Sequence, residues 1–128
     1  DYERAVELLQ DADLPQARYN LGLIKAKQRH LNEAYELLRP YSDVNAAVVA
    51  LSVNRNDEAR DIMDSVKVAT PVAEYVRAMV AARFKEHDAF FLHIVKACEE
   101  EKLRMRAVDE PDFYGYKDDE RFRALINR

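Results

Sequence analysis

The residues best suited to chemistry in this 128-residue chain are three histidines, one cysteine and several runs of carboxylates. His30 and His87 fall in predicted turns, and His93 lies on a predicted helix. Metal ligands on one helical face are typically four positions apart. Cys98 follows His93 by five positions, so the spacing indicates no metal site. We interpret Cys98 as a buried structural thiol, which is the usual role of a free cysteine.

The carboxylates lie mainly in the runs Asp57-Glu58, Glu99-Glu100-Glu101 and Asp118-Asp119-Glu120. Such runs are typical of solvated faces and helix N-termini. The only two glycines, Gly22 and Gly115, stand alone, which excludes a glycine-rich phosphate loop. We therefore expect no catalytic residues, no metal and no cofactor.

The elements that position these residues are predicted to be helices. Apolar residues recur at spacings of three and four, and two glycines and four prolines are the only strong breakers. Thr70 before Pro71 is a strong helix start. The predicted helices are Tyr2–Gln10, Gln16–Lys27, Asn32–Leu38, Val44–Val53, Asp57–Val66, Pro71–Phe84, Asp88–Glu101 and Asp119–Asn127, with a short helical turn at Leu103–Val108.

An internal repeat organises the helices. DYERAVELL, HLNEAYELL and RNDEARDIM share a turn, an acidic residue, a small residue and an apolar residue four positions later. A glycine inside a helix costs about 1 kcal/mol relative to alanine, so Gly22 indicates close contact with a second helix. The small residue of the three copies is Ala5, Ala34 and Ala59. Gly22 lies twelve residues before Ala34, and Ala47 lies twelve residues before Ala59. A fourth copy fits, with Ala78 and Phe90 at the corresponding positions.

Tyr19-Asn20-Leu21-Gly22, Lys27-Gln28, Glu33-Ala34 and Leu38 together resemble the tetratricopeptide repeat. The resemblance covers roughly Asp1 to Cys98. It implies an all-α, right-handed superhelical solenoid of about three and a half helical hairpins over residues 1–102, followed by a C-terminal capping segment over residues 103–128. The alanines are closer together than the family period, which implies shortened, degenerate repeats.

The resemblance also implies a concave groove lined by the first helix of each hairpin. Packing of its apolar members against neighbouring helices is the alternative. The expected partner-binding residues are Tyr19, Asn20, Leu23, Lys27, Asn45, Val48, Tyr75, Met79 and Arg83.

The C-terminal stretch EPDFYGYKDDERFRALIN carries the spaced apolar residues Phe113, Phe122, Leu125 and Ile126. We expect them to fold over the last hairpin, because the end of a solenoid must be covered. The alternative is a second interaction surface made by Phe113, Tyr114 and Tyr116.

The overall composition limits the classes of partner that the chain is expected to bind. A formal net charge of −4 disfavours nucleic acid, and the longest apolar run, Ala46–Leu51, is too short for membrane insertion. One cysteine leaves the compartment undetermined, and we expect a soluble protein of the cytoplasm or periplasm. DYERAVELL begins in mid-pattern, which indicates a larger parent polypeptide. The expected function is a non-catalytic module that docks a partner peptide or protein, and the alternative is a spacer or oligomerisation module that packs against its parent or a second copy.

Overall fold

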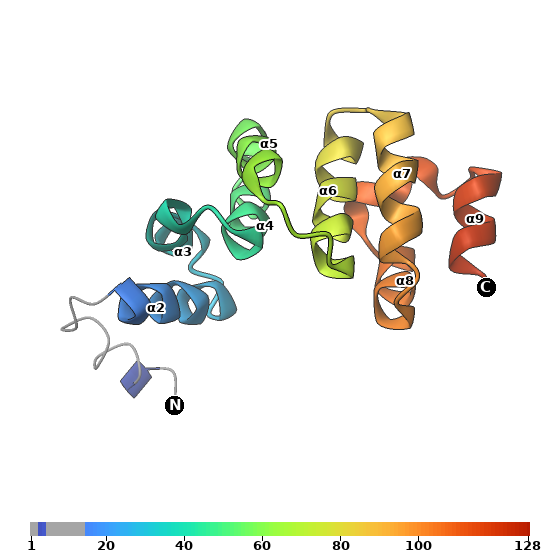
Figure 1. The fold of residues 1–128 in the computed structure, drawn as a ribbon. Coiled ribbons are helices and arrows are strands. Elements are labelled where there is room, and N and C mark those ends of the chain that lie inside the picture. The colour runs from blue at the N-terminus through green and yellow to red at the C-terminus, as the bar shows by residue number, and fades with distance from the viewer. Residues whose placement is uncertain (1–2, 5–14) are drawn as a thin grey trace. The chain divides into compact units, whose positions relative to one another are not determined.

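A computed structural model describes residues 3–4 and 15–128, and every regular element in these ranges is helical (Figure 1). The helix expected at Tyr2–Gln10 lies, apart from Glu3 and Arg4, outside the described residues. The α-helices are α2 (Pro15–Lys27), α3 (Leu31–Leu38), α4 (Val44–Ser52), α5 (Asn56–Ser65), α6 (Pro71–Arg83), α7 (His87–Ala97), α8 (Glu101–Val108) and α9 (Glu120–Ile126), and the 3-10 helices are η1 (Arg39–Tyr41) and η2 (Pro111–Tyr116).

Capping explains where several helices begin. The Thr70 hydroxyl accepts a hydrogen bond from the Ala73 amide at 3.2 Å, and Pro71 occupies the first turn, as the sequence predicts. Asp43 caps α4 in the same way, through the amide of Ala46 at 2.9 Å. None of the helices that the structure describes is both long enough and apolar enough to cross a bilayer.

The break predicted between the helix at Asp88–Glu101 and the helical turn at Leu103–Val108 lies about four residues earlier, because α7 ends at Ala97 and α8 begins at Glu101. Helix C-termini carry a partial negative charge, so three glutamates in the last turn of one helix would be unfavourable. The break places Glu101 in the first turn of α8, where a negative charge is stabilising.

Three antiparallel hairpins are formed by α2 with α3, α4 with α5, and α6 with α7. The connecting turns share one backbone conformation, with a non-glycine residue at positive φ: Arg29 (65°), Asn54 (61°) and Lys85 (57°). At each turn, two amides close the first helix in a Schellman pattern. The six bonds are Arg29 N to Ala26 O, His30 N to Lys25 O, Asn54 N to Leu51 O, Arg55 N to Ala50 O, Lys85 N to Ala82 O and Glu86 N to Ala81 O.

Replacing Lys85 with glycine is expected to raise the free energy of unfolding by about 0.5–1 kcal/mol. The left-handed conformation costs an ordinary residue about 1–2 kcal/mol, and the greater unfolded-state entropy of glycine offsets part of that gain. Urea denaturation followed by circular dichroism measures the change. Asn54→Gly is the matched control and should gain only a few tenths of a kcal/mol, because asparagine tolerates this conformation. Equal gains at both positions would contradict the explanation.

The chain divides into two compact units, residues 1–66 and 67–128. In the first unit α3 packs against α4, so the α2–α3 hairpin contacts the α4–α5 hairpin. Gly22 lies against α3: a Cβ atom at this position would be 2.7 Å from Cδ2 of Leu38 and 3.2 Å from Cβ of Leu37. Leu38 is completely buried. The glycine is therefore required by the close approach of α3 side chains, in agreement with the close contact predicted for the small residue.

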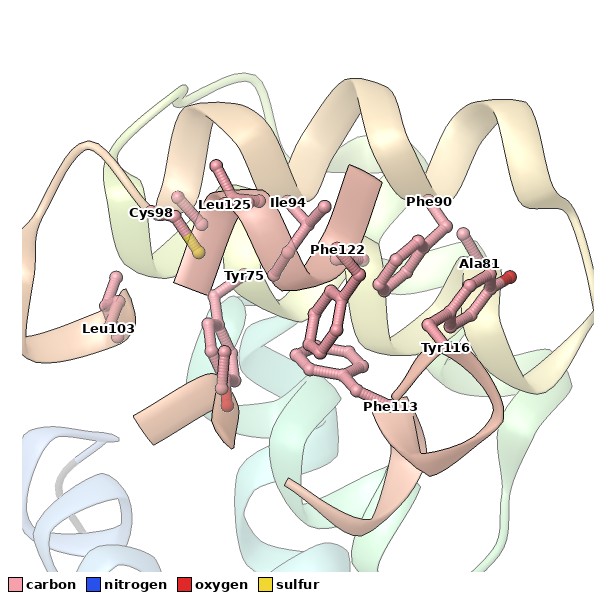
Figure 2. Close-up of a cluster of buried hydrophobic side chains, with 13 residues drawn as sticks. Tyr75, Ala81, Phe90, Ile94, Cys98, Leu103, Phe113, Tyr116, Phe122 and Leu125 are labelled. Atoms are coloured by element: carbon pink, nitrogen blue, oxygen red, sulfur yellow. The ribbon is translucent and has the colours of Figure 1, made fainter. Parts of the chain in front are cut away.

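The second unit has one aromatic core in which the C-terminal segment packs against α6 and α7 (Figure 2). Phe90 stacks on Tyr116 with ring centroids 3.8 Å apart and an angle of 5° between the rings. Phe113, Phe122 and Leu125 are buried in the same cluster, and Ile126 packs against it half-buried. The boundary predicted after residue 102 falls inside this unit, because residues on both sides of it share the core.

Candidate functional site

One face of α2 carries four of the residues expected to bind a partner. Tyr19, Leu23 and Lys27 follow one another at intervals of four and therefore lie on the same side of the helix. Tyr19 and Leu23 are half-buried, whereas Asn20 and Lys27 are exposed. Asn20, Leu23, Ile24 and Lys27 line an open surface hollow of about 350 Å³. The hollow combines an apolar floor with an amide and an ammonium group.

Tyr19 connects this face to α4. Its hydroxyl donates a hydrogen bond to Oδ2 of Asp43 at 2.6 Å and accepts one from Nδ2 of Asn45 at 2.7 Å. The ring of Tyr41 packs edge-on against the Tyr19 ring with centroids 4.9 Å apart. Burial and the hydrogen bond to Asp43 raise the pKa of Tyr19, so the phenol remains a donor. The structure thus brings together Tyr19 and Asn45, which the sequence places on two different hairpins.

Asn20 and Val48, two other residues expected to bind a partner, lie in the first unit as well. Asn20 is exposed, and its side-chain carbonyl accepts a hydrogen bond from Nε2 of Gln16 at 3.1 Å. Val48 lies on α4, one turn after Asn45, and is half-buried.

The three predicted residues of α6 have a different environment, because the chain's own C-terminal segment covers them. Tyr75 is 4% exposed, and its hydroxyl donates to Oε1 of Glu110 at 3.1 Å. The Arg83 guanidinium donates through Nε to Oδ1 of Asp112 at 3.0 Å. Met79 packs half-buried against the aromatic core. The contacts of Tyr75, Met79 and Arg83 are those of packing within the chain, which was the alternative to a partner-binding groove. Partner binding by these three residues stays a prediction.

The sequence interpretation missed a buried ionic cluster between α6 and α7. Glu74 is 4% exposed and is bonded through Oε1 to Nη1 of Arg77 at 2.9 Å and through Oε2 to Nδ1 of His93 at 2.7 Å. Burial favours the neutral acid, but the hydrogen bond to His93 and the charges of His93, Arg77 and Lys96 outweigh it, so the pKa of Glu74 is lowered. The sequence signal that could have indicated this cluster is the glutamate inside the apolar stretch PVAEYV.

Glu74 makes stability depend on pH in a predictable direction. Its folded-state pKa lies below the unfolded value of about 4.3, so its stabilising contribution is complete above that value and is lost as pH falls through the folded pKa. Glu74→Gln is expected to lower stability at pH 6 and to flatten the decline between about pH 5 and pH 3. Urea melts at pH 6, 5, 4 and 3 measure the change, with Glu99→Gln, at an exposed position between α7 and α8, as control. Parallel curves for Glu74→Gln and the native chain would contradict the assignment.

The other chemistry-bearing residues have structural positions. Cys98 is completely buried, and burial raises the pKa of its thiol. Phe113 and Tyr116 are buried, whereas Tyr114 is 55% exposed. Within the described ranges, no three His, Cys, Asp or Glu side chains are grouped so that they could hold a metal ion.

Comparison of the chain with protein-family models, with curated proteins and with solved structures finds no match. What is established is an all-helical protein with an open, partly apolar face on α2 in the first unit and a covered face on α6 in the second.

Proposed function

We propose that this chain is a non-catalytic protein-interaction module of tetratricopeptide-like helical hairpins. In this proposal the hairpins stack as a right-handed solenoid, and a partner peptide or protein docks on the α2 face together with Asn45 and Val48 of α4. The observation that carries it is the open hollow lined by Asn20, Leu23, Ile24 and Lys27.

The repeated turns support the solenoid part of the proposal. Three hairpins close with the same pair of hydrogen bonds, and the helix that follows each turn places a buried residue at the same position: Ala34, Ala59 and Phe90. These positions are 25 and 31 residues apart, which fits unequal copies of one unit. Stacked hairpins of this kind present the first helix of each pair on one side.

The rigidity of the α2 face supports docking. Gly22 fixes α2 against Leu38 of α3, and the Tyr19 hydroxyl fixes it against Asp43 and Asn45. A preformed surface leaves most of the ordering cost to the ligand, which favours binding of short extended or helical segments.

Affinity capture with matched variants tests this function. The native chain and a Leu23→Asp/Lys27→Glu variant serve as baits in a lysate of the source cells, after circular dichroism has shown equal folding. Leu92→Asp/Lys102→Glu makes the same chemical changes at exposed residues of α7 and α8. A protein retained by the native chain and by the control, but lost from the α2 variant, is the expected result. Equal retention by all three would contradict docking on α2.

Self-association is the second candidate, and one observation favours it. Leu92 and Val95 lie three residues apart on α7 and are 56% and 42% exposed, which makes a small uncovered apolar strip. Light scattering over a concentration series separates the two functions. A constant monomer mass excludes self-association, whereas a dimer that Leu92→Asp dissociates would assign the module to assembly.

A further inference from the structure

The faces of α2 and α6 carry the same sequence of side-chain types. Tyr19, Leu23 and Lys27 on α2 and Tyr75, Met79 and Arg83 on α6 are each a tyrosine, an apolar residue and a base at intervals of four. The base lies two positions before the positive-φ residue of the following turn in both hairpins. The two faces are therefore equivalent positions of the repeat.

The α6 face shows what such a face binds, because it is occupied by the chain's own segment Glu110–Phe113, sequence EPDF. A carboxylate accepts from the tyrosine hydroxyl, as Glu110 does from Tyr75. A second carboxylate, that of Asp112, pairs with Arg83, and both side chains are at most 20% exposed. The next residue, Phe113, places its ring 5.3 Å from that of Tyr75. Figure 2 draws both side chains in the buried cluster.

The α2 face reproduces two of these three contacts. Asp43 accepts from the Tyr19 hydroxyl at 2.6 Å, as Glu110 does from Tyr75 at 3.1 Å. The ring of Tyr41 packs against that of Tyr19 at 4.9 Å, as the ring of Phe113 does against that of Tyr75 at 5.3 Å. Within the described ranges, the counterpart of Asp112 is missing. No acidic side chain in residues 3–4 and 15–128 pairs with Lys27, which is exposed beside the open hollow over Leu23.

We propose that the α2 face binds a segment of a partner protein in which an acidic residue is followed directly by a large apolar one. The carboxylate pairs with the Lys27 ammonium, and the apolar side chain fills the hollow lined by Leu23 and Ile24. Charge-assisted contacts are among the stronger hydrogen bonds, and a few buried anchors carry most of the binding energy at protein interfaces. The inference rests on the proposed docking function and names the chemical class of its ligand.

A labelled peptide with the sequence DEPDFYGYK, that of residues 109–117, is the probe. Fluorescence anisotropy follows its titration into the full chain up to about 1 mM protein, the weak end of specific recognition. Lys27→Glu and Leu23→Asp are each expected to weaken binding at least tenfold, whereas the control Lys102→Glu leaves it unchanged. In the peptide, changing its central aspartate to asparagine or its phenylalanine to alanine is also expected to weaken binding at least tenfold.

Three outcomes would overturn the inference: no binding to the native chain, equal binding to Lys27→Glu, or equal binding of the phenylalanine-to-alanine peptide. Self-association of the full chain that Lys27→Glu abolishes would also overturn it, because the occupant would then be the same segment of a second copy. If the peptide does not bind but the capture experiment still loses a partner with the α2 variant, docking stands and only the ligand class is wrong. If both fail, the proposed function fails as well.

Discussion

Replacing Phe113 with alanine is expected to lower the free energy of unfolding by about 3–5 kcal/mol, the usual cost of removing a fully buried phenylalanine. Phe113 is 1% exposed, and its ring contacts those of Tyr75, Phe90 and Phe122 at centroid distances of 5.3, 5.2 and 6.2 Å. The cavity that the substitution leaves would lie between the α6–α7 hairpin and the C-terminal segment.

The adjacent residue is the matched control for Phe113. Tyr114 belongs to the same 3-10 helix but is 55% exposed, so Tyr114→Ala is expected to change stability by no more than about 0.5 kcal/mol. Urea denaturation of the full chain, followed by circular dichroism, compares the two variants. Similar losses would show that the segment is not packed as described, and a small loss for Phe113→Ala would show that the cap contributes little to the core.

Replacing Gly22 with valine is expected to destabilise the chain by about 1–3 kcal/mol. The new Cβ would be 2.7 Å from both Cγ and Cδ2 of Leu38, a contact that requires a shift. Leu38 is fully buried, and because protein interiors are close-packed its side chain can shift only by displacing neighbours. The higher helix propensity of valine relative to glycine returns only a few tenths of a kcal/mol.

Gly115 provides the control for this steric argument. A Cβ at Gly115 meets no atom within 4 Å, so Gly115→Val is expected to stay close to the native stability. Thermal and urea denaturation of both variants measure the difference. A Gly22→Val chain as stable as the native one would contradict the close approach of α3, and with it the explanation of the glycine inside α2.

The helices of the three hairpins were predictable because local signals define them. Apolar spacing predicted their extent, and Thr70-Pro71 predicted the start of α6. The α7–α8 break was predicted about four residues too late because the apolar pattern runs on past Ala97, and only the cost of three glutamates in a last turn indicates the earlier interruption. The 3-10 helix at Pro111–Tyr116 was missed because its conformation depends on packing against α6.

The candidate site was predictable only in part. The resemblance placed Tyr19, Asn20, Leu23 and Lys27 on one face of a helix, where the structure has them. It could not show that Glu110 and Asp112 cover the equivalent face of α6, because that contact joins residues 29 and 35 positions apart. The Glu74–His93 pair required the alignment of α6 with α7, which single-sequence reasoning does not supply.

Site-specific photo-crosslinking in the source cells tests the central proposal, docking on the α2 face, most directly. A photoreactive phenylalanine analogue is placed at Leu23 in one full-length variant and at the exposed Leu92 of α7 in another. The proposal predicts a discrete cross-linked species of higher mass from position 23, lost on Lys27→Glu, and none of the same mass from position 92. Cross-linking from position 92 alone, or from position 23 regardless of Lys27, would contradict it.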